Sequence, residues 1–232
     1  MDNSSTTAIR AVVFDAYGTL FDVHSAVAAH AARLGQQAAP VSDLWRVKQL
    51  EYTWTRSLIG RYRDFRALTE EALDYALARF GIIDRALRAD LLAAYMTLAA
   101  YPDVPVALSG LRALGLSTAI LSNGSPDMLA AAVTAAGLGD RLDAVISVHE
   151  IGAFKPPAAA YEPVLRRLDV VAREVVFVSS NRWDIAGAAA FGFRPVWCNR
   201  ARMPDEYADL PPVAAITDLG GLAAWVQAAR SG

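Results

Sequence analysis

The sequence is poor in cysteine and has no strong excess of charge. Its 232 residues include one cysteine, Cys198, which excludes an internal disulfide bond and a metal site built from several cysteines. Cys198 lies in the apolar run 195–198, where a buried side chain is expected. The 22 basic and 24 acidic residues give a formal net charge of −2 and form no run of one sign. The composition therefore predicts no nucleic-acid partner and no anionic membrane surface.

Long apolar runs are also missing. No segment approaches the roughly 18 consecutive apolar residues of a membrane-spanning helix. The polar residues 1–7 lack the apolar region of a signal peptide. We therefore expect a cytoplasmic protein without membrane contact, in which residues 1–7 form a flexible tail. With 54% hydrophobic and 20% charged residues, the chain has enough apolar material for a buried core.

Short apolar runs alternate with helical segments along most of the chain. The run 9–14 ends at Asp15 and Gly18, as expected for a buried strand that closes in a turn. The residues that follow it read as helices only, with Ser42 as a candidate N-cap. The predicted helices of this stretch cover 42–58, 69–80 and 84–99. Beyond it, strands are predicted at 116–121, 144–148, 175–178 and 195–198, with helices at 125–136, 158–168 and 183–191.

This order of elements predicts an α/β protein with a doubly wound, Rossmann-like parallel sheet. The sheet and its helices are expected to form a discontinuous core domain from residues 8–22 and 99–230, and residues 23–98 an inserted helical cap domain. The active site of such a sheet lies at the carboxyl ends of its strands. Polar residues gather at these predicted ends: Asp15, Ser122 with Asn123, Lys155, and the segment 179–184.

Asp15 is the candidate nucleophile. Residues 14–20 (FDAYGTL) resemble the opening motif of the haloacid dehalogenase superfamily, in which an aspartate that leaves the first strand attacks the substrate. A carboxylate must be held by donors and partly desolvated to attack carbon. The alternative is an aspartate that merely caps a turn, and the other polar groups at the same sheet edge argue against it.

Two positions separate the branches of this superfamily. Its phosphatases resemble one another in a second aspartate two residues after the first, and in further acidic residues that hold Mg²⁺. Here Tyr17, with an ordinary pKa of about 10, takes the first position, and in the segment 179–184 serines leave only Asp184. A departing halide needs neither a proton nor Mg²⁺, so these differences favour dehalogenation without metal or cofactor.

The resemblance narrows to the bacterial L-2-haloacid dehalogenases and extends from residue 9 to about residue 225. It includes the cap segment 44–54 (LWRVKQLEYTW), residues 121–126 (LSNGSP), and 179–181 followed by Trp183 and Asp184. It implies hydrolysis of small (S)-2-haloalkanoic acids to (R)-2-hydroxy acids and halide, through an ester on the aspartate. It also implies a homodimer.

The resemblance assigns a role to each matching residue. The catalytic residues are Asp15 as nucleophile, Thr19, Lys155 and Asn181 to orient and neutralise it, Arg46 to face the departing halide, Ser179 and Asp184 for positioning and water activation, and Tyr161 to support the lysine. The substrate-binding residues are Ser122, Asn123 and the backbone amides near Ala16 and Tyr17 for the carboxylate, Tyr17, Leu50, Phe65 and Trp183 for the alkyl chain, and Arg46, which faces the substrate as well as the halide.

Several of these residues have a plainer interpretation. Arg46 and Lys155 can be solvated charges, Asp184 can cap a helix, and Leu50, Phe65 and Trp183 can be ordinary core.

Two residues depart from the family pattern. Pro157 stands where aspartate is usual, and Arg182 stands where a small residue is common. Arg182 is expected to add positive charge near the site. The rival functions are a Mg²⁺-dependent phosphatase of the same fold and a catalytically silent binding protein.

Overall fold

The computed structural model describes residues 8–231 and contains a six-stranded, wholly parallel sheet. The order of the strands is β3-β2-β1-β4-β5-β6, so the chain first builds outward from β1 on one side and then returns to its other side. This order confirms the predicted doubly wound α/β fold. The strands are β1 (Ala11–Phe14), β2 (Ser117–Ser122), β3 (Ala144–Ser147), β4 (Val175–Ser179), β5 (Arg194–Cys198) and β6 (Ala214–Ile216).

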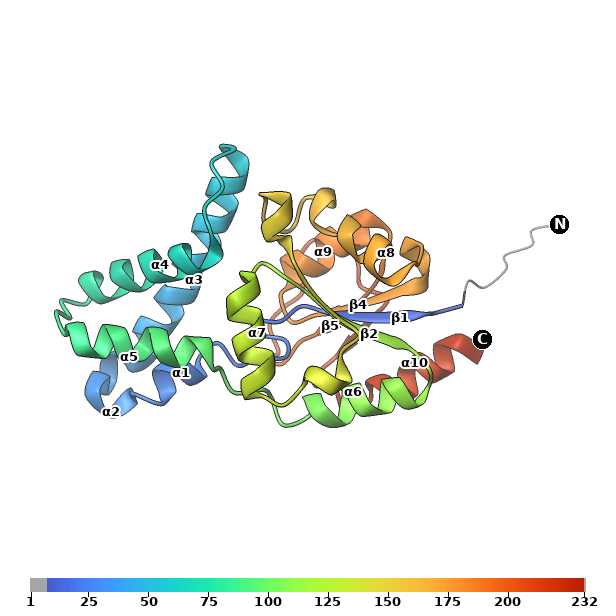
Figure 1. The fold of residues 1–232 in the computed structure, drawn as a ribbon, viewed down its shortest axis with the longest axis horizontal. Coiled ribbons are helices and arrows are strands. Elements are labelled where there is room, and N and C mark those ends of the chain that lie inside the picture. The colour runs from blue at the N-terminus through green and yellow to red at the C-terminus, as the bar shows by residue number, and fades with distance from the viewer. Residues whose placement is uncertain (1–7, 232) are drawn as a thin grey trace.

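Helices cover both faces of the sheet, which explains why its central strands are apolar on both sides. Every residue of β1 and β4 is buried. Figure 1 shows α8 and α9 on one side of the strands and α6 and α10 on the other. The helices of this unit are α6 (Val104–Ala113), α7 (Pro126–Ala135), α8 (Glu162–Leu168), α9 (Arg182–Phe191) and α10 (Leu222–Ser231).

A second group of helices lies beyond the carboxyl ends of the strands (Figure 1). It consists of α1 (Ser25–Ala28), α2 (Ala31–Leu34), α3 (Ala38–Leu58), α4 (Phe65–Arg79) and α5 (Arg85–Met96). Asp64 and Asp84 cap α4 and α5, because each carboxylate accepts a hydrogen bond from a backbone amide of the first turn. This group stands over the sheet edge at which the predicted site residues gather.

Two predicted helix starts in this group were wrong. Ser42 does not cap α3, which begins at Ala38; Ser42 is buried in the helix, and its Oγ lies 2.7 Å from His24 Nδ1. Helix α4 begins at Phe65 rather than at Thr69, because Asp64 supplies the cap. In both cases a polar side chain that packs inside the protein resembled the start of a helix.

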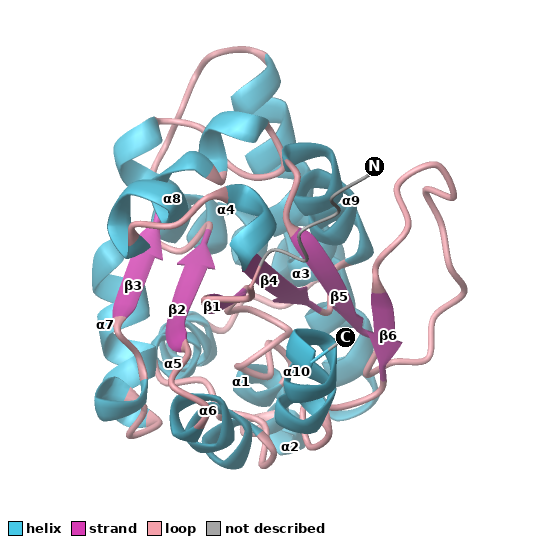
Figure 2. Ribbon diagram, turned by 90° about the vertical axis from the view of Figure 1, so that its right-hand side faces the viewer, coloured by secondary structure: helices cyan, strands magenta, loops and turns pink. Residues whose placement is uncertain are grey.

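Several short or terminal elements were not predicted. The elements without a predicted counterpart are α1, α2, α6, β6 and α10, and the predicted helix 158–168 combines the 3₁₀ turn Ala158–Ala160 with α8. Figure 2 shows β6 beside β5, with a long loop connecting them. No helix within residues 8–231 is long and apolar enough to cross a membrane. The predicted tail 1–7 lies outside the described residues.

Candidate active site

Asp15 follows β1 at the point where the chain reverses its direction of sheet building, between β2 and β4. Ligands bind at such a switch point in open α/β sheets. Its Oδ1 lies 2.8 Å from Lys155 Nζ, and its Oδ2 accepts hydrogen bonds from Asn181 Nδ2 at 2.8 Å, Thr19 Oγ1 at 3.1 Å and Ser179 Oγ at 3.5 Å. At 4% exposure, Asp15 is held by donors and largely desolvated. It is not a turn cap at the surface.

Lys155 lies between two carboxylates. Its Nζ donates hydrogen bonds to Asp15 Oδ1 at 2.8 Å, to Asp184 Oδ2 at 2.6 Å and to the carbonyl oxygen of Leu121 at 3.1 Å. Burial lowers the pKa of Lys155, but the two carboxylates outweigh burial and raise that pKa above its ordinary value. The lysine therefore stays charged beside Asp15, and the interpretation as a solvated loop lysine is excluded.

Asp184 and Tyr161 complete this buried network. The Tyr161 hydroxyl donates to Asp184 Oδ1 at 2.7 Å, and the absence of a side chain at Gly187 on α9 leaves room for that hydroxyl. Burial raises the pKa of Asp184 from 3.8 to about 6, against the opposing effect of the Lys155 charge. Burial also raises the pKa of Tyr161 well above its ordinary value, so Tyr161 stays a donor. Asp184 serves this network rather than capping α9.

The two loops that carry the polar groups are fastened to each other. Gly18, with a φ of +90°, lets the chain turn after Asp15. The Thr19 hydroxyl then accepts a hydrogen bond from the Ser180 amide at 2.8 Å, while the Ser179 hydroxyl accepts from the Asn181 amide at 3.1 Å. The Ser180 amide therefore fastens the β4 loop to the β1 loop, and the Ser179 hydroxyl braces the β4 loop itself.

Arg46 reaches the site from α3. Its guanidinium donates to the Tyr17 carbonyl oxygen at 3.2 Å, to Asn181 Oδ1 at 3.4 Å and, within the helix, to Gln49 Oε1 at 2.8 Å. Arg46 is therefore directed at the loop that carries Asp15, and the interpretation as a surface charge is excluded.

A small cavity of about 10 Å³ lies between Asp15 and the α3–α4 helices. Its lining contains a carboxylate, a guanidinium and several apolar side chains: Asp15, Tyr17, Arg46, Leu50, Phe65, Ser122, Asn123 and Trp183. Seven of the eight predicted substrate-binding residues are among them, and Ala16 is not. A larger hollow of about 670 Å³ between α7, β3 and α8 is lined by none of the predicted site residues.

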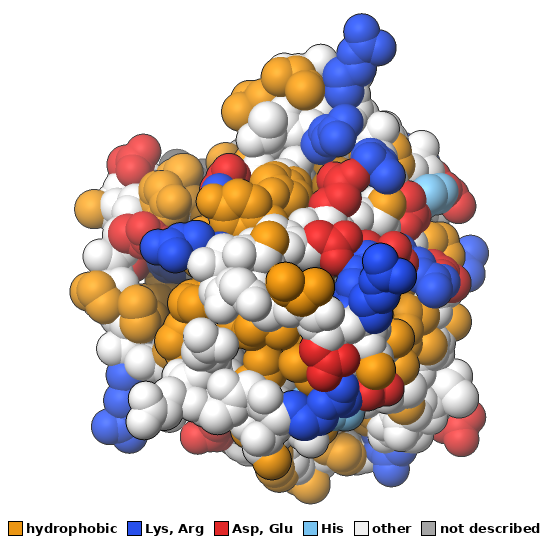
Figure 3. All heavy atoms as spheres, turned by 90° about the vertical axis from the view of Figure 1, so that its left-hand side faces the viewer, with side chains coloured by type: hydrophobic (Ala, Val, Ile, Leu, Met, Phe, Trp, Pro, Cys, Tyr) orange, Lys and Arg blue, Asp and Glu red, His pale blue; other side chains and the backbone are white. Residues whose placement is uncertain are grey.

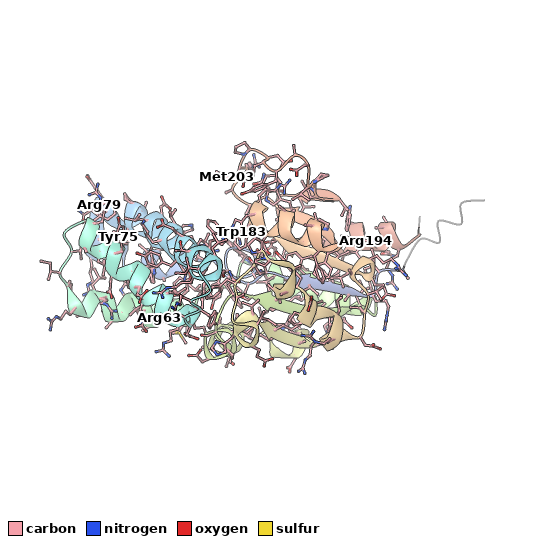
Figure 4. The ribbon with its side chains drawn as sticks, turned by 90° about the horizontal axis from the view of Figure 1, so that it is seen from above. Arg63, Tyr75, Arg79, Trp183, Arg194 and Met203 are labelled. Atoms are coloured by element: carbon pink, nitrogen blue, oxygen red, sulfur yellow. The ribbon has the colours of Figure 1, made fainter. Side chains whose placement is uncertain are left out.

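The apolar side of the cavity combines residues from both groups of helices. Tyr17 stacks on Tyr95 with ring centroids 5.7 Å apart, and its hydroxyl is buried without a partner. Trp183 meets Trp54 of α3 edge to face at 5.5 Å. Figure 4 shows Trp183 at the junction between the helical group and the sheet. Leu50, Phe65 and Trp183 therefore form a wall of the cavity, not only core.

Ser122 and Asn123 also hold the loops around the cavity. The Ser122 hydroxyl accepts from the Gly124 amide at 3.1 Å, and Asn123 Oδ1 accepts from the Lys155 amide at 2.9 Å. Asn123 thereby fixes the loop that presents Lys155. Pro157 precedes the 3₁₀ turn Ala158–Ala160, at the entry to the α8 region.

Arg182 does not add charge to the site, contrary to the prediction. It is 4% exposed, and its Nε donates to Asp205 Oδ1 at 2.6 Å. Another nitrogen donates to the carbonyl oxygens of Tyr207 and Leu210, both at 3.1 Å. The side chain leaves the first turn of α9 toward the β5–β6 loop and lies outside the cavity lining.

The polar residues behind Arg46 were not among the predicted site residues. Gln49, Thr69 and Tyr95 are buried, and each makes a side-chain hydrogen bond within a network that ends at Arg46. The spacing of three residues between Arg46 and Gln49 on one helix face was the signal available. Within residues 8–231, no group of three or more histidine, cysteine or acidic side chains is arranged to hold a metal ion.

A family model described as haloacid dehalogenase-like hydrolase matches residues 9–192. The fold and the buried aspartate thus point to a hydrolase of this class. The chain is 52% identical over 215 residues to (S)-2-haloacid dehalogenase 1 of Pseudomonas sp. strain CBS-3, covering 92% of this chain and 95% of that one. It is 46% identical over 216 residues to (S)-2-haloacid dehalogenase 4A of Burkholderia cepacia, covering 93% and 94%.

Solved structures agree with these relatives. The L-2-haloacid dehalogenase of Xanthobacter autotrophicus with chloropropionic acid covalently bound superposes with a TM-score of 0.86 at 41% identity, covering 94% of this chain and 98% of that one. A crystal structure described as a dehalogenase with intermediate complex gives 0.92 at 45% identity, covering 94% and 97%. The chain belongs to the haloacid dehalogenase-like hydrolases, in the branch of the 2-haloacid dehalogenases.

Proposed function

We propose that the protein hydrolyses small (S)-2-haloalkanoic acids to (R)-2-hydroxy acids and halide, with Asp15 as the covalent nucleophile. One observation carries the proposal: a single cavity is lined by the Asp15 carboxylate from the sheet and by the Arg46 guanidinium from α3. A nucleophile and a cation that face each other across a small apolar cavity suit the displacement of an anion from carbon.

In the first step, an oxygen of Asp15 attacks C2 in line with the carbon–halogen bond. A C2–O ester bond forms, the halide leaves with the bonding electrons, and the configuration at C2 inverts. Arg46 receives the halide as its charge develops. Lys155 and Asn181 orient the carboxylate, while Ser122, Asn123 and the amides near Ala16 and Tyr17 bind the substrate carboxylate.

In the second step, water attacks the carbonyl carbon of the Asp15 ester. The acyl–oxygen bond breaks, the 2-hydroxy acid leaves, and Asp15 is regenerated with one oxygen from water. Asp184 takes a proton from the attacking water, because a pKa of about 6 suits a base near neutral pH, and returns it to the departing C2 oxygen as the ester breaks. Tyr161 and Lys155 hold Asp184, and Ser179 positions the loop.

The size of the cavity has a further consequence. A space of about 10 Å³ holds about one water molecule, which is less than any 2-haloalkanoate needs. We propose that residues 23–98 form a cap domain that moves relative to a core domain of residues 8–22 and 99–230 when substrate enters.

The reaction is proposed to need no metal. The groups around Asp15 are hydrogen-bond donors and a lysine cation, whereas Mg²⁺ prefers several carboxylate oxygens. Halide release from (S)-2-chloropropionate should be unchanged by EDTA, and the (R)-enantiomer should be inert. Release of phosphate from a phosphate ester that depends on added Mg²⁺ would favour the phosphatase. The absence of both activities would favour a silent binding protein.

The path of oxygen tests Asp15 directly. A single turnover in H₂¹⁸O with enzyme in excess should give unlabelled 2-hydroxy acid and place the label in the peptide that contains Asp15. Direct attack by water would instead label the product and leave Asp15 unlabelled. That result would overturn the covalent mechanism without touching the substrate class.

The partners proposed are the 2-haloacid, the halide product and a second copy of the chain, with no nucleic acid and no membrane. What supports a homodimer is the outer face of α3 and α4, where Val47, Leu58, Ile59 and Tyr75 are exposed by 44% or more. Figure 3 shows apolar side chains among charges of both signs on that side of the molecule. Light scattering at several protein concentrations tests whether the chain forms a dimer.

The cytoplasmic location stays a prediction.

A further inference from the structure

The guanidinium of Arg46 is held from behind by a buried polar network that belongs entirely to α3, α4 and α5. Arg46 donates to Gln49 Oε1 at 2.8 Å, and the same oxygen accepts from the Tyr95 hydroxyl at 3.1 Å. Gln49 is fully buried. Its contact with Arg46 is shorter than the contacts of Arg46 with the sheet side of the site, at 3.2 and 3.4 Å.

Thr69 fixes which end of the Gln49 amide faces Arg46. The Thr69 hydroxyl donates its single proton to the Phe65 carbonyl oxygen at 2.8 Å, so only its lone pairs remain for Gln49. Gln49 Nε2 donates to Thr69 Oγ1 at 2.7 Å. The amide must therefore direct its NH₂ group at Thr69 and its oxygen at Arg46. A flipped amide would place two donors against each other at Arg46 and two acceptors against each other at Thr69, and the Tyr95 hydroxyl would lose its acceptor.

We propose that Gln49, oriented by Thr69, is a positioning residue that sets the direction of the Arg46 guanidinium toward the departing halide. This proposal rests on the proposed function, because it assigns Arg46 to the leaving group. A buried amide is costly unless its groups are paired, and the oxygen and NH₂ group of Gln49 both have partners here. Because the network lies within the three helices, it holds Arg46 ready before the helices close over substrate.

The test uses two network variants and a matched control. Gln49→Met keeps the length of the side chain and removes the acceptor of Arg46. Thr69→Val is nearly isosteric and removes the group that orients the Gln49 amide. Thr53→Val makes the same change at a fully buried threonine of α3, whose hydroxyl donates to the Leu50 carbonyl oxygen at 2.6 Å. Urea unfolding shows whether each variant is folded.

The readout is the rate of halide release in a single turnover, measured for (S)-2-chloropropionate and (S)-2-bromopropionate. Loss of a hydrogen bond to a charged group should slow release in Gln49→Met by about ten- to a hundredfold, and loss of the neutral bond in Thr69→Val by about two- to tenfold. The chloride should suffer more, because the poorer leaving group needs more stabilisation. The substrate KM should stay near its original value, because the sheet side binds the carboxylate.

The outcomes separate this proposal from the proposed function. If the unaltered protein releases no halide, the proposed function fails. If it does, but Thr69→Val matches Thr53→Val and folded Gln49→Met releases both halides at the original rate, the positioning role is overturned. A uniform slowing of both substrates in step with lost stability would also overturn it, since a purely structural role would produce that pattern.

Discussion

The two sides of the cavity are built differently. On the sheet side, Asp15, Lys155 and Asp184 form a cluster that is at most 4% exposed, and each is bound by at least one partner within 2.8 Å. On the helical side, Arg46 is the one charged residue among those that line the cavity, and its contacts with the sheet side are longer, at 3.2 and 3.4 Å. The remainder of that side is an apolar wall.

This difference predicts different consequences for substitutions on the two sides of the cavity. The sheet side couples its ionised groups so tightly that removing one leaves another unpaired in a buried place, so activity and stability are lost together. The helical side can lose its charge without leaving such a defect. Variants on the two sides should therefore differ in how far activity and stability change together.

The largest effect is expected at Lys155. Lys155→Met leaves the Asp15 and Asp184 carboxylates buried without their shared cation, which should lower the free energy of unfolding by about 3–5 kcal/mol and abolish turnover. Urea unfolding and halide release measure the two losses. Lys48→Met, which removes a lysine paired with Glu51 on the outer side of α3, is the control and should change neither. A Lys155→Met protein of unaltered stability would show that the cluster is not coupled.

Arg46 should show the opposite pattern. Arg46→Ala should lower turnover by about a hundredfold or more, because the departing halide loses its cation. Its stability should fall by only about 1 kcal/mol, because the lost hydrogen bonds are few and partly exposed. Arg56→Ala, on the same helix with its partner Glu71 at 4.0 Å, is the matched control. Normal turnover in a folded Arg46→Ala variant would show that Arg46 takes no part in the reaction.

The sheet side of the cavity could be predicted from the sequence more fully than the helical side. Asp15 lies just after the apolar strand β1, and Ser179 is the last residue of the apolar strand β4. Because the carboxyl ends of parallel strands meet at one edge of a sheet, the pattern of apolar runs was enough to predict that the two residues lie close together. Arg46 lies on a helix far away in the chain, and only family resemblance connected it with Asp15. Gln49 was missed because its spacing of three residues from Arg46 is the only signal, and the same spacing is common between solvated polar residues on a helix.

Arg182 shows why adjacency in the chain misleads. It lies between Asn181 and Trp183, which both face the site, and charge near the site was therefore expected. At the start of α9, however, consecutive side chains point in different directions, and Arg182 leaves toward Asp205. The β5–β6 loop that receives it has no periodic pattern from which its position could be predicted.

A smaller effect is expected on the acid side of the pH profile. Burial raises the pKa of Asp184 to about 6 from 3.8, so the folded protein binds more protons than the unfolded chain between these values. For this group, stability therefore falls as pH rises through that window, and acidification there does not unfold the protein through Asp184. Turnover should nevertheless fall below about pH 6, because Asp184 must be ionised to accept a proton.

Tyr161→Phe tests that assignment. The hydroxyl of Tyr161 lowers the pKa of Asp184 by donating to it, so its removal should raise that pKa and move the acid limb of the rate of ester hydrolysis, measured in a single turnover, to higher pH. The phenylalanine ring keeps the contacts with Phe177, Phe191 and Phe193. A limb that stays in place, or moves to lower pH, would remove Asp184 as the titrating group.

The smallest effect is expected where the two groups of helices meet at the surface. Arg66 of α4 and Asp127 of α7 form an ion pair at 3.1 Å across this junction, with both side chains 54% exposed. Exposed pairs of this kind contribute about 0–1 kcal/mol and are screened by salt. Arg66→Ala should therefore leave turnover within about twofold and stability within about 0.5 kcal/mol of the original protein. A tenfold change in turnover would give a different result, if turnover of the original protein depended on salt and that of the variant did not. Surface charge would then control the closure that we propose, and the helical side would do more than cover the chemistry of the sheet.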